Sequence, residues 1–223
     1  MSTGLDLGLD PERATHADDG AGRSRPVLVW RAATPFRCVS SGALGGGLAD
    51  RSWVFNAEVS LGYQRDDVAG HLGEIGTELG LEAGAGTGLM TAARVLHLVT
   101  ATDGGVGCAA TVGVSTPTWA AAPDGTWSRW VPGTINLVCL VPAPLSDAAL
   151  VNAVVTATEA KTQALLDAGV PGTGTASDAV VVCCPRGGNE AYGGPRSTWG
   201  ARLARSVHAA VADGTKQFLA HRD

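Results

Sequence analysis

Polar residues interrupt an otherwise apolar helical pattern in the second half of the chain. Thr158, Glu159, Lys161 and Thr162 lie in the middle of the segment 146–168, whose two ends are apolar. An ammonium and a carboxylate held beside apolar side chains are groups that acid–base chemistry uses. The more common interpretation is an amphipathic helix with a solvated glutamate and a lysine whose aliphatic part covers apolar surface. At a spacing of three and four, one row of this helix consists of Val151, Val154, Thr158, Lys161 and Leu165.

Two short apolar segments flank this helix and are predicted to be buried strands. They span 134–141 and 179–184, and both are rich in β-branched residues. Ser146 is a favourable N-cap, and Gly169 can adopt the left-handed conformation that ends a helix. The turn 172–177, GTGTAS, either forms a nest of N–H groups for an oxyanion or simply connects helix and strand. The sequence therefore predicts a strand–helix–strand unit that carries polar groups.

The composition is that of one globular domain. The chain has 223 residues, of which 45% are hydrophobic and 17% are charged. A net charge of −5 argues against a nucleic-acid partner. No apolar run reaches the length of a membrane span and no secretory signal pattern begins the chain, so we expect a cytoplasmic protein without a membrane partner. Five cysteines without CxxC spacing agree with a reducing compartment, and the oligomeric state stays open.

The order of the predicted elements indicates the fold class. Residues 1–25 are polar and are expected to form a disordered tail, followed by a single domain over 26–223. Several strands follow one another without helices, which predicts an α+β fold: a mixed or mainly antiparallel sheet system of about seven strands with three packed helices. A layered α-β-β-α arrangement is the alternative. The other expected elements are strands over 27–31, 36–40, 52–60, 95–100 and 106–114, a loop over 84–90, a helix capped by Asp66, and a helix over 197–213.

Several separated blocks resemble the adenosylcobinamide amidohydrolase family of corrinoid salvage. The blocks match in the expected order and extend over about residues 35 to 212. The resemblance implies hydrolysis of the amide that joins a corrin side chain to aminopropanol, which gives adenosylcobyric acid. It implies a corrinoid substrate; we expect no cofactor, and whether a metal assists stays open. The blocks are SSGALGGG at 40–47, Asn56 with Tyr63, GLMTAA at 88–93, GTINL at 133–137, TEAK at 158–161, GTGTASDAVVV at 172–182 and GGP at 193–195.

Amide hydrolysis requires an activated nucleophile, a stabilised oxyanion and a protonated leaving amine. The chain has no G-x-S-x-G or H-E-x-x-H motif and its five histidines are scattered, so we expect neither a catalytic triad nor a metal site. The resemblance then leaves Glu159 as the base, Lys161 as an electrostatic stabiliser or proton donor, and Asp178 as a second carboxylate. Thr134 becomes a nucleophile if the chain cleaves itself after Gly133. The expected substrate-binding residues are Ser40, Ser41, Gly46, Asn56, Asn136, Thr158, Gly174 and Thr175.

Two other functions stay open. A corrinoid-binding protein without hydrolysis would keep the glycine-rich loops but would not need Glu159 or Lys161. An amidase of related shape would hydrolyse other amides and ignore corrinoids. The glycines of 40–47 either let backbone approach a ligand or form a flexible turn. Three tryptophans in a Pro/Gly-rich loop either line an apolar ligand surface or cover the core: Trp119, Trp127 and Trp130.

Overall fold

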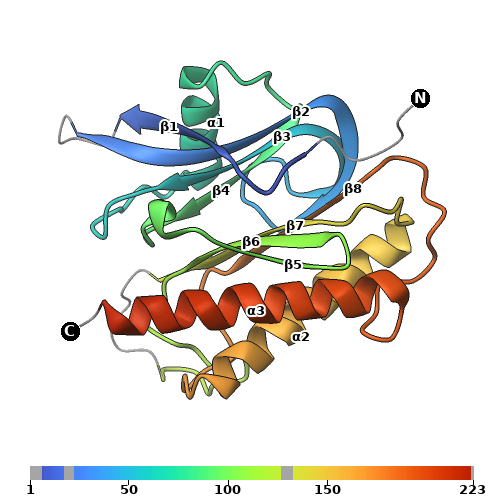
Figure 1. Ribbon diagram of the computed structural model, residues 1–223. Coiled ribbons are helices and arrows are strands. Elements are labelled where there is room, and N and C mark those ends of the chain that lie inside the picture. Colours follow the sequence, from blue (N-terminus) through green and yellow to red (C-terminus); the bar gives the residue numbers. More distant parts are fainter. Residues whose placement is uncertain (1–6, 18–22, 127–132, 222–223) are drawn as a thin grey trace.

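The chain folds around one mixed β-sheet (Figure 1). The structure is a computed structural model, and it describes residues 7–17, 23–126 and 133–221. The strand order is β4-β3-β2-β8-β7-β6-β5, and β1 pairs with β2 outside this path. The strands are β1 (Glu12–Ala17), β2 (Ser24–Ser40), β3 (Gly47–Glu58), β4 (Gly86–Thr91), β5 (Val99–Asp103), β6 (Val106–Val112), β7 (Ile135–Leu140) and β8 (Ala179–Cys184); the helices are α1 (Val68–Glu78), α2 (Asp147–Asp167) and α3 (Thr198–Ala220), with a 3-10 turn at Val95–His97.

The long strand β2 joins the two halves of the sheet. Strand β3 pairs along both parts of β2, whereas β1 pairs with its first part and β8 with its last four residues. The pairing register with β3 shifts between Arg31 and Phe36, around Pro35, which has no N–H group to donate. The two strands expected over 27–31 and 36–40 are therefore one irregular strand.

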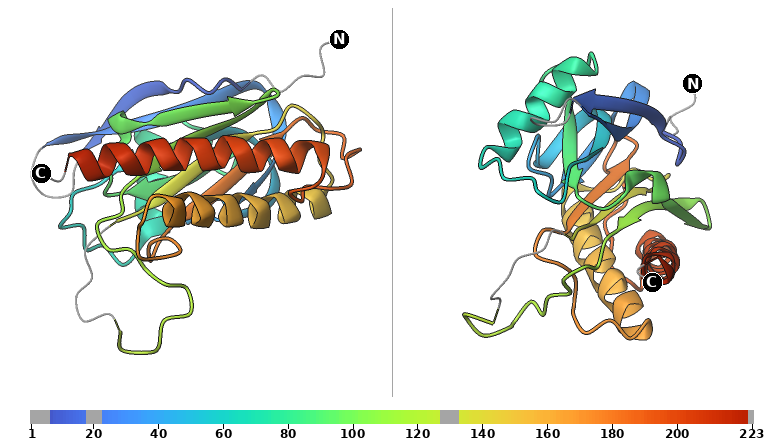
Figure 2. Two further views of the ribbon diagram at one scale, coloured as in Figure 1. Left: turned by 60° about the horizontal axis from the view of Figure 1, so that its bottom comes forward. Right: turned by 90° about the vertical axis from the view of Figure 1, so that its left-hand side faces the viewer.

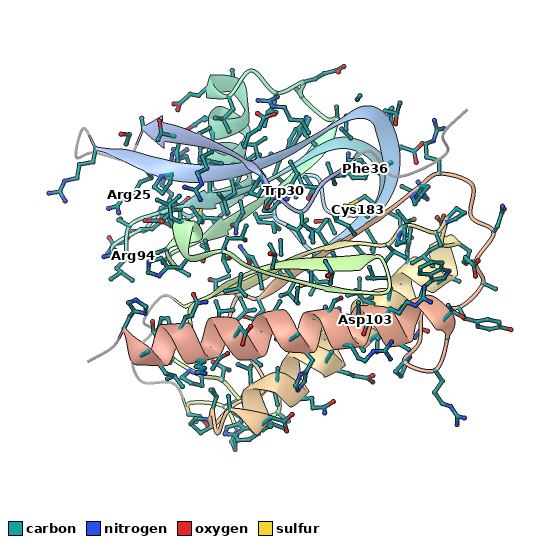
Figure 3. The ribbon with its side chains drawn as sticks, viewed as in Figure 1. Arg25, Trp30, Phe36, Arg94, Asp103 and Cys183 are labelled. Carbon is teal, nitrogen blue, oxygen red and sulfur yellow. The ribbon has the colours of Figure 1, made fainter. Side chains whose placement is uncertain are left out.

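The two halves of the sheet face each other across an apolar interior. Trp30, Phe36 and Cys183 lie in this interior (Figure 3), together with Val54 from β3 and Val138 from β7. Helix α1 packs on the outer face of the β1–β4 half, and α2 and α3 pack on the outer face of the β5–β8 half (Figure 2). The α+β class is confirmed, and its layers follow the α-β-β-α alternative.

The β7–α2–β8 unit forms as the sequence predicts. Ser146 caps α2 by accepting a hydrogen bond from the N–H of Ala149 at 3.1 Å, and Gly169 ends the helix with a φ of +73°. Strands β7 and β8 are parallel neighbours, so both begin at the same edge of the sheet. This arrangement brings the residues before β7 next to the turn before β8.

The expected disordered tail is wrong for part of its length. Strand β1 lies within residues 1–25 and pairs antiparallel with β2. Leu7 is buried in the core, and the indole N–H of Trp30 donates to the carbonyl of Leu9 at 3.2 Å. Composition does not predict this strand because it has no continuous apolar pattern. Backbone pairing with β2 and two leucines hold it in place instead. Residues 1–6 and 18–22 of the expected tail lie outside the described residues.

Several element boundaries also differ from the sequence-based expectation. The expected loop over 84–90 contains β4, whose glycines hide the strand pattern. The strand expected over 95–100 begins only at Val99, after the 3-10 turn, although the predicted hairpin with β6 is present. The α1 cap is Asp67, whose side chain accepts from the N–H of Gly70 at 2.8 Å, and not Asp66.

The last helix, α3, extends beyond its expected end to Ala220. Among the described residues, no helix combines the length and the apolar character that a membrane crossing needs.

Candidate active site

A cavity of about 370 Å³ opens where the starts of β7 and β8 meet the ends of β2 and β4. Several of the predicted site residues or their direct neighbours line it. The residues that matter for its chemistry are Ser41, Tyr63, Met90, Thr134, Ser177 and Asp178.

Asp178 is held by four hydrogen bonds at the edge of this cavity. Its Oδ1 accepts from the N–H of Ile135 at 2.9 Å and from the hydroxyl of Thr175 at 2.5 Å. Its Oδ2 accepts from the N–H of Thr175 at 3.0 Å and from the ammonium of Lys161. A carboxylate has about four acceptor positions, so Asp178 has little capacity left for a substrate proton. This geometry fits a positioning residue better than a general base.

Lys161 reaches Asp178 from helix α2 and is buried there. The two side chains are only 7% and 10% exposed, and they form an ion pair beneath the turn before β8. Gly174 passes directly over this pair, where an added Cβ would overlap both the Asp178 carboxylate and the Lys161 ammonium. The turn therefore needs glycine at this position to accommodate the ion pair.

Two hydroxyl groups face each other beside Asp178. The Thr134 Oγ1 and Ser177 Oγ atoms are 2.9 Å apart, and Ser177 also donates to the carbonyl of Gly133 at 3.3 Å. Thr134 is buried, whereas Ser177 is exposed at the cavity. The sequence analysis missed Ser177, although it stands next to Asp178 inside the GTGTASD block.

Asn56 and Asn136 form a buried polar network that joins the two halves of the sheet. Asn136 Nδ2 donates to Asn56 Oδ1 at 2.9 Å and to the carbonyl of Met90 at 3.0 Å, and Asn56 Nδ2 donates to the Thr111 hydroxyl at 2.9 Å. Both asparagines are 1% exposed, and neither lines the cavity. Asn136 therefore holds the backbone of Met90, a cavity residue, and neither asparagine reaches the cavity surface.

The glycine-rich segment 40–47 closes one side of the cavity. Ser41 lines the cavity and accepts from the N–H of Val180 at 2.9 Å. Ser40 is buried and its hydroxyl lies 2.7 Å from that of Thr87. Gly45 has a φ of +65° and packs directly against the backbone of β4. Close backbone packing thus accounts for this glycine, and Gly46 is exposed outside the cavity lining.

The structure does not bring Glu159 or Thr158 to the cavity. Both are exposed on α2, where Glu159 lines a separate hollow between α2 and α3 beside Asp167 and His208. The row of α2 that begins at Val151 is not the buried face of the helix, because Val151 is 51% exposed. The sequence-based expectation for this face is therefore wrong. Small side chains let α2 approach the sheet and α3 closely, so its buried face consists mainly of alanines: Ala149, Leu150, Ala153, Thr156, Ala157, Ala160, Lys161, Ala164 and Leu165.

A second hollow of about 360 Å³ shares one lining residue, Ala92, with the cavity. It is bordered by Arg94, His97 and His221. Trp119, from the tryptophan-containing loop, is 46% exposed, and Trp127 and Trp130 lie outside the described residues. Across the described part of the chain, no three His, Cys, Asp or Glu side chains come together in a group that could hold a metal ion.

The structure is a single-domain α+β protein with a cavity of about 370 Å³ where β7 and β8 begin. The chain belongs to the adenosylcobinamide amidohydrolase family, whose model matches residues 10–222. This match confirms the family resemblance and extends it into β1.

Two relatives carry the name adenosylcobinamide amidohydrolase. One, from Methanosarcina mazei, is 31% identical over 189 residues, which cover 80% of this chain and 90% of the relative. The other, from Halobacterium salinarum, is 44% identical over 130 residues, and the match spans only 55% of each chain. An uncharacterized protein of Methanocaldococcus jannaschii is 32% identical over 89 residues, or 36% of this chain and 35% of the relative.

Proposed function

We propose that this protein hydrolyses the amide between aminopropanol and the corrin side chain of adenosylcobinamide. The products are adenosylcobyric acid and aminopropanol, as in corrinoid salvage. The observation that carries this proposal is the family match over residues 10–222, within which the segments before β7 and β8 line one cavity. We place the reaction in the cytoplasm, in agreement with five cysteines that are all buried free thiols.

The size of the cavity indicates which part of the substrate it holds. A volume of about 370 Å³ suits a small ligand or one arm of a large one. A corrin ring with its side chains is larger than this space. The aminopropanol arm therefore enters the cavity, and the ring rests outside, over the partly exposed segment 41–47 and the hollow beside Arg94.

The polar groups at the starts of β7 and β8 have distinct roles in this reaction. The hydroxyls of Thr134 and Ser177 contact the scissile amide, because they are the paired polar groups at the cavity surface. Lys161 and Asp178 hold the turn that carries Ser177 and are positioning residues. Glu159 has no part in it, because its exposed side chain lines a different hollow.

The test is a mass-spectrometric assay of the purified full chain with adenosylcobinamide, with and without a chelator. We expect equal amounts of adenosylcobyric acid and aminopropanol under both conditions. Thr134→Val removes the hydroxyl but keeps the shape of the side chain and should abolish turnover. Thr100→Val, at an exposed position of β5, is the matched control and should retain it.

The alternative functions give different results in this assay. Tight corrinoid binding without product would indicate a binding protein, and hydrolysis of small amides alone would indicate an amidase with another substrate. Neither binding nor product would reject the proposal. Intact mass tests self-cleavage: fully active protein that is not cleaved after Gly133 would rule out a Thr134 nucleophile activated by its own α-amine.

A further inference from the structure

Two cysteines face each other where the two halves of the sheet are joined. Strands β2 and β8 pair antiparallel at this junction, and Cys38 lies directly opposite Cys183 in their register. Both residues are 0% exposed and belong to the apolar interior between the halves, where Cys183 is labelled in Figure 3. Because directly opposite residues of a sheet point to the same face, the two side chains are neighbours.

The hydrogen-bond pattern of the junction brings this pair especially close. The N–H of Ser41 donates to the carbonyl of Val180 at 3.0 Å, and the register places these two residues opposite each other. Hydrogen-bonded and non-hydrogen-bonded pairs alternate along an antiparallel ladder, so Cys38 and Cys183, three pairs further on, are a non-hydrogen-bonded pair. The Cα atoms of such a pair are about 4.5 Å apart. Disulfides join Cα atoms about 4.4–6.8 Å apart, so this spacing suits a disulfide.

The other three cysteines cannot replace this pair at the junction. Cys184 lies opposite Arg37 and points to the other face of the sheet, into the core beneath the helices. Cys108 and Cys139 also face each other, but β6 and β7 belong to the same half of the sheet. All five cysteines are described and free, and a bond between the two halves therefore requires Cys38 with Cys183.

We propose that Cys38 and Cys183 are a site of reversible oxidation, at which hydrogen peroxide forms a disulfide that joins the two halves of the sheet covalently. A reducing compartment keeps the pair as two thiols. Peroxide transfers one oxygen to the first thiol, which gives a sulfenic acid and one water. The facing thiol then attacks the sulfenic sulfur, so that the S–S bond forms and a second water leaves. The two thiols lose two electrons, and the peroxide gains them.

The position of the pair favours a disulfide over further oxidation. Burial and the neighbouring Cys38 raise the pKa of the Cys183 thiol well above its ordinary value, so the closed junction is unreactive. Only four residue pairs join β2 to β8, and opening this short ladder exposes a thiol to peroxide. When the ladder closes again, the sulfenic acid meets the facing thiol in an interior that excludes more peroxide.

The experiment treats the reduced full-length chain with hydrogen peroxide in urea below the unfolding midpoint, where the fold opens locally but stays native. Mass spectrometry of peptides prepared without reductant should identify a Cys38–Cys183 linkage, and dithiothreitol should return both thiols. Without reductant, the Tm of the oxidised chain should exceed that of the reduced chain by about 5–15 °C, because the bond closes a long loop in the unfolded chain.

Variants assign this gain to the pair. Each variant is compared in its oxidised and reduced forms, since any loss of a buried cysteine also lowers the Tm of the reduced chain. Cys38→Ala and Cys183→Ala should each remove the linkage and the gain in Tm that depends on it. Cys184→Ala, at a buried cysteine next to the pair, is the matched control and should keep both.

Four outcomes would overturn the proposal. Cys38 and Cys183 could stay free thiols after the peroxide treatment, or they could become sulfinic or sulfonic acids. The linkage could form only in fully unfolded chain, which would show that the native register does not direct it. An equal gain in Tm for Cys38→Ala and the wild type would show that the stabilisation comes from another bond. None of these measurements depends on the proposed hydrolysis, so either proposal can fail without the other.

Discussion

At the scale of single residues, the site depends on the ion pair between Lys161 and Asp178, which is buried and does not face a ligand. Lys161 and Asp178 are both largely buried, and the Asp178 carboxylate is occupied by the backbone and side chain of Thr175 as well as by Ile135. Ion pairs of this kind contribute little net stability, but removing one partner leaves an uncompensated charge. The pair therefore fixes the turn before β8 in one arrangement.

Removing one charge of this pair should be more damaging than removing both. We expect Lys161→Met to lower the free energy of unfolding by about 3–5 kcal/mol, because it leaves the Asp178 carboxylate buried without its cation. The double variant Lys161→Met with Asp178→Asn should recover part of that loss. Urea denaturation of the two variants measures the difference. A double variant less stable than Lys161→Met would contradict this account.

Adding a methyl group to the turn before β8 should also disturb the ion pair between Lys161 and Asp178. Gly174→Ala would place Cβ against both charged groups, so the pair must separate and turnover should fall at least tenfold, on the order of 1.4 kcal/mol in the barrier. The control is Gly73→Ala in α1, where nothing lies within 4 Å of the added carbon and the helix should gain about 0.5–1 kcal/mol. Steady-state kinetics and Tm are measured for both. Normal turnover in Gly174→Ala would show that the pair is dispensable.

At the scale of elements, the β7–α2–β8 unit could be predicted from sequence because each signal is local. The Ser146 cap, the Gly169 terminator and the two apolar strands depend on neighbouring residues alone. The buried face of α2 could not be predicted, since alanines mark it only when the partner surfaces are known. For the same reason the sequence predicts Lys161 and Asp178 only as separate candidates. Their pairing, the position of Ser177 beside them and the exposure of Glu159 depend on how distant segments pack, so they could be seen only in the fold.

The start of α2 is tied to β2 by two charged side chains. The Arg37 guanidinium donates to both oxygens of Asp147, at 2.9 and 2.7 Å. These hydrogen bonds, with the attraction between the charges, hold the pKa of the Asp147 carboxyl below its ordinary value. The contribution to stability is therefore present above about pH 4 and is lost as the pH falls through the lowered pKa.

Asp147→Asn should lower Tm by a few degrees at most at pH 7, because the pair is exposed to solvent. The difference from wild type should shrink as the pH falls below about 4, where the wild-type carboxyl also becomes neutral. Thermal unfolding at pH 7 and pH 3 measures it, with Asp124→Asn in an exposed loop as the control. A difference that grows in acid would contradict the assigned pKa direction.

At the scale of the whole molecule, two sheet halves enclose one interior and three helices cover the outside. All five cysteines lie within these layers and are 0% exposed. Burial raises the pKa of the Cys184 thiol to about 11, and burial together with the neighbouring Cys38 raises the pKa of Cys183 well above its ordinary value. The thiolate is the reactive form of cysteine. The native fold therefore suppresses thiol chemistry in two ways, by burying the thiols and by raising their pKa.

Native protein should therefore react with a thiol reagent at pH 8 only as fast as it unfolds. We expect no rapid labelling under native conditions and five labelled thiols in denaturant. Labelling followed by mass spectrometry over several hours measures the rate, and destabilising variants such as Lys161→Met should accelerate it. Rapid native labelling of any cysteine would contradict the enclosed interior.

The junction between the two halves of the sheet is the pairing of β2 with β8. Strand β8 lies between β2 and β7, yet it follows every other described strand in sequence order. A nascent chain that stops before residue 179 can pair β1 to β4 and β5 to β7, but each group keeps an open edge. The sheet becomes continuous only when β8 enters between them, through four residue pairs with β2. Completion of the fold, and of the cavity at the start of β8, is thus a late, long-range event in biosynthesis.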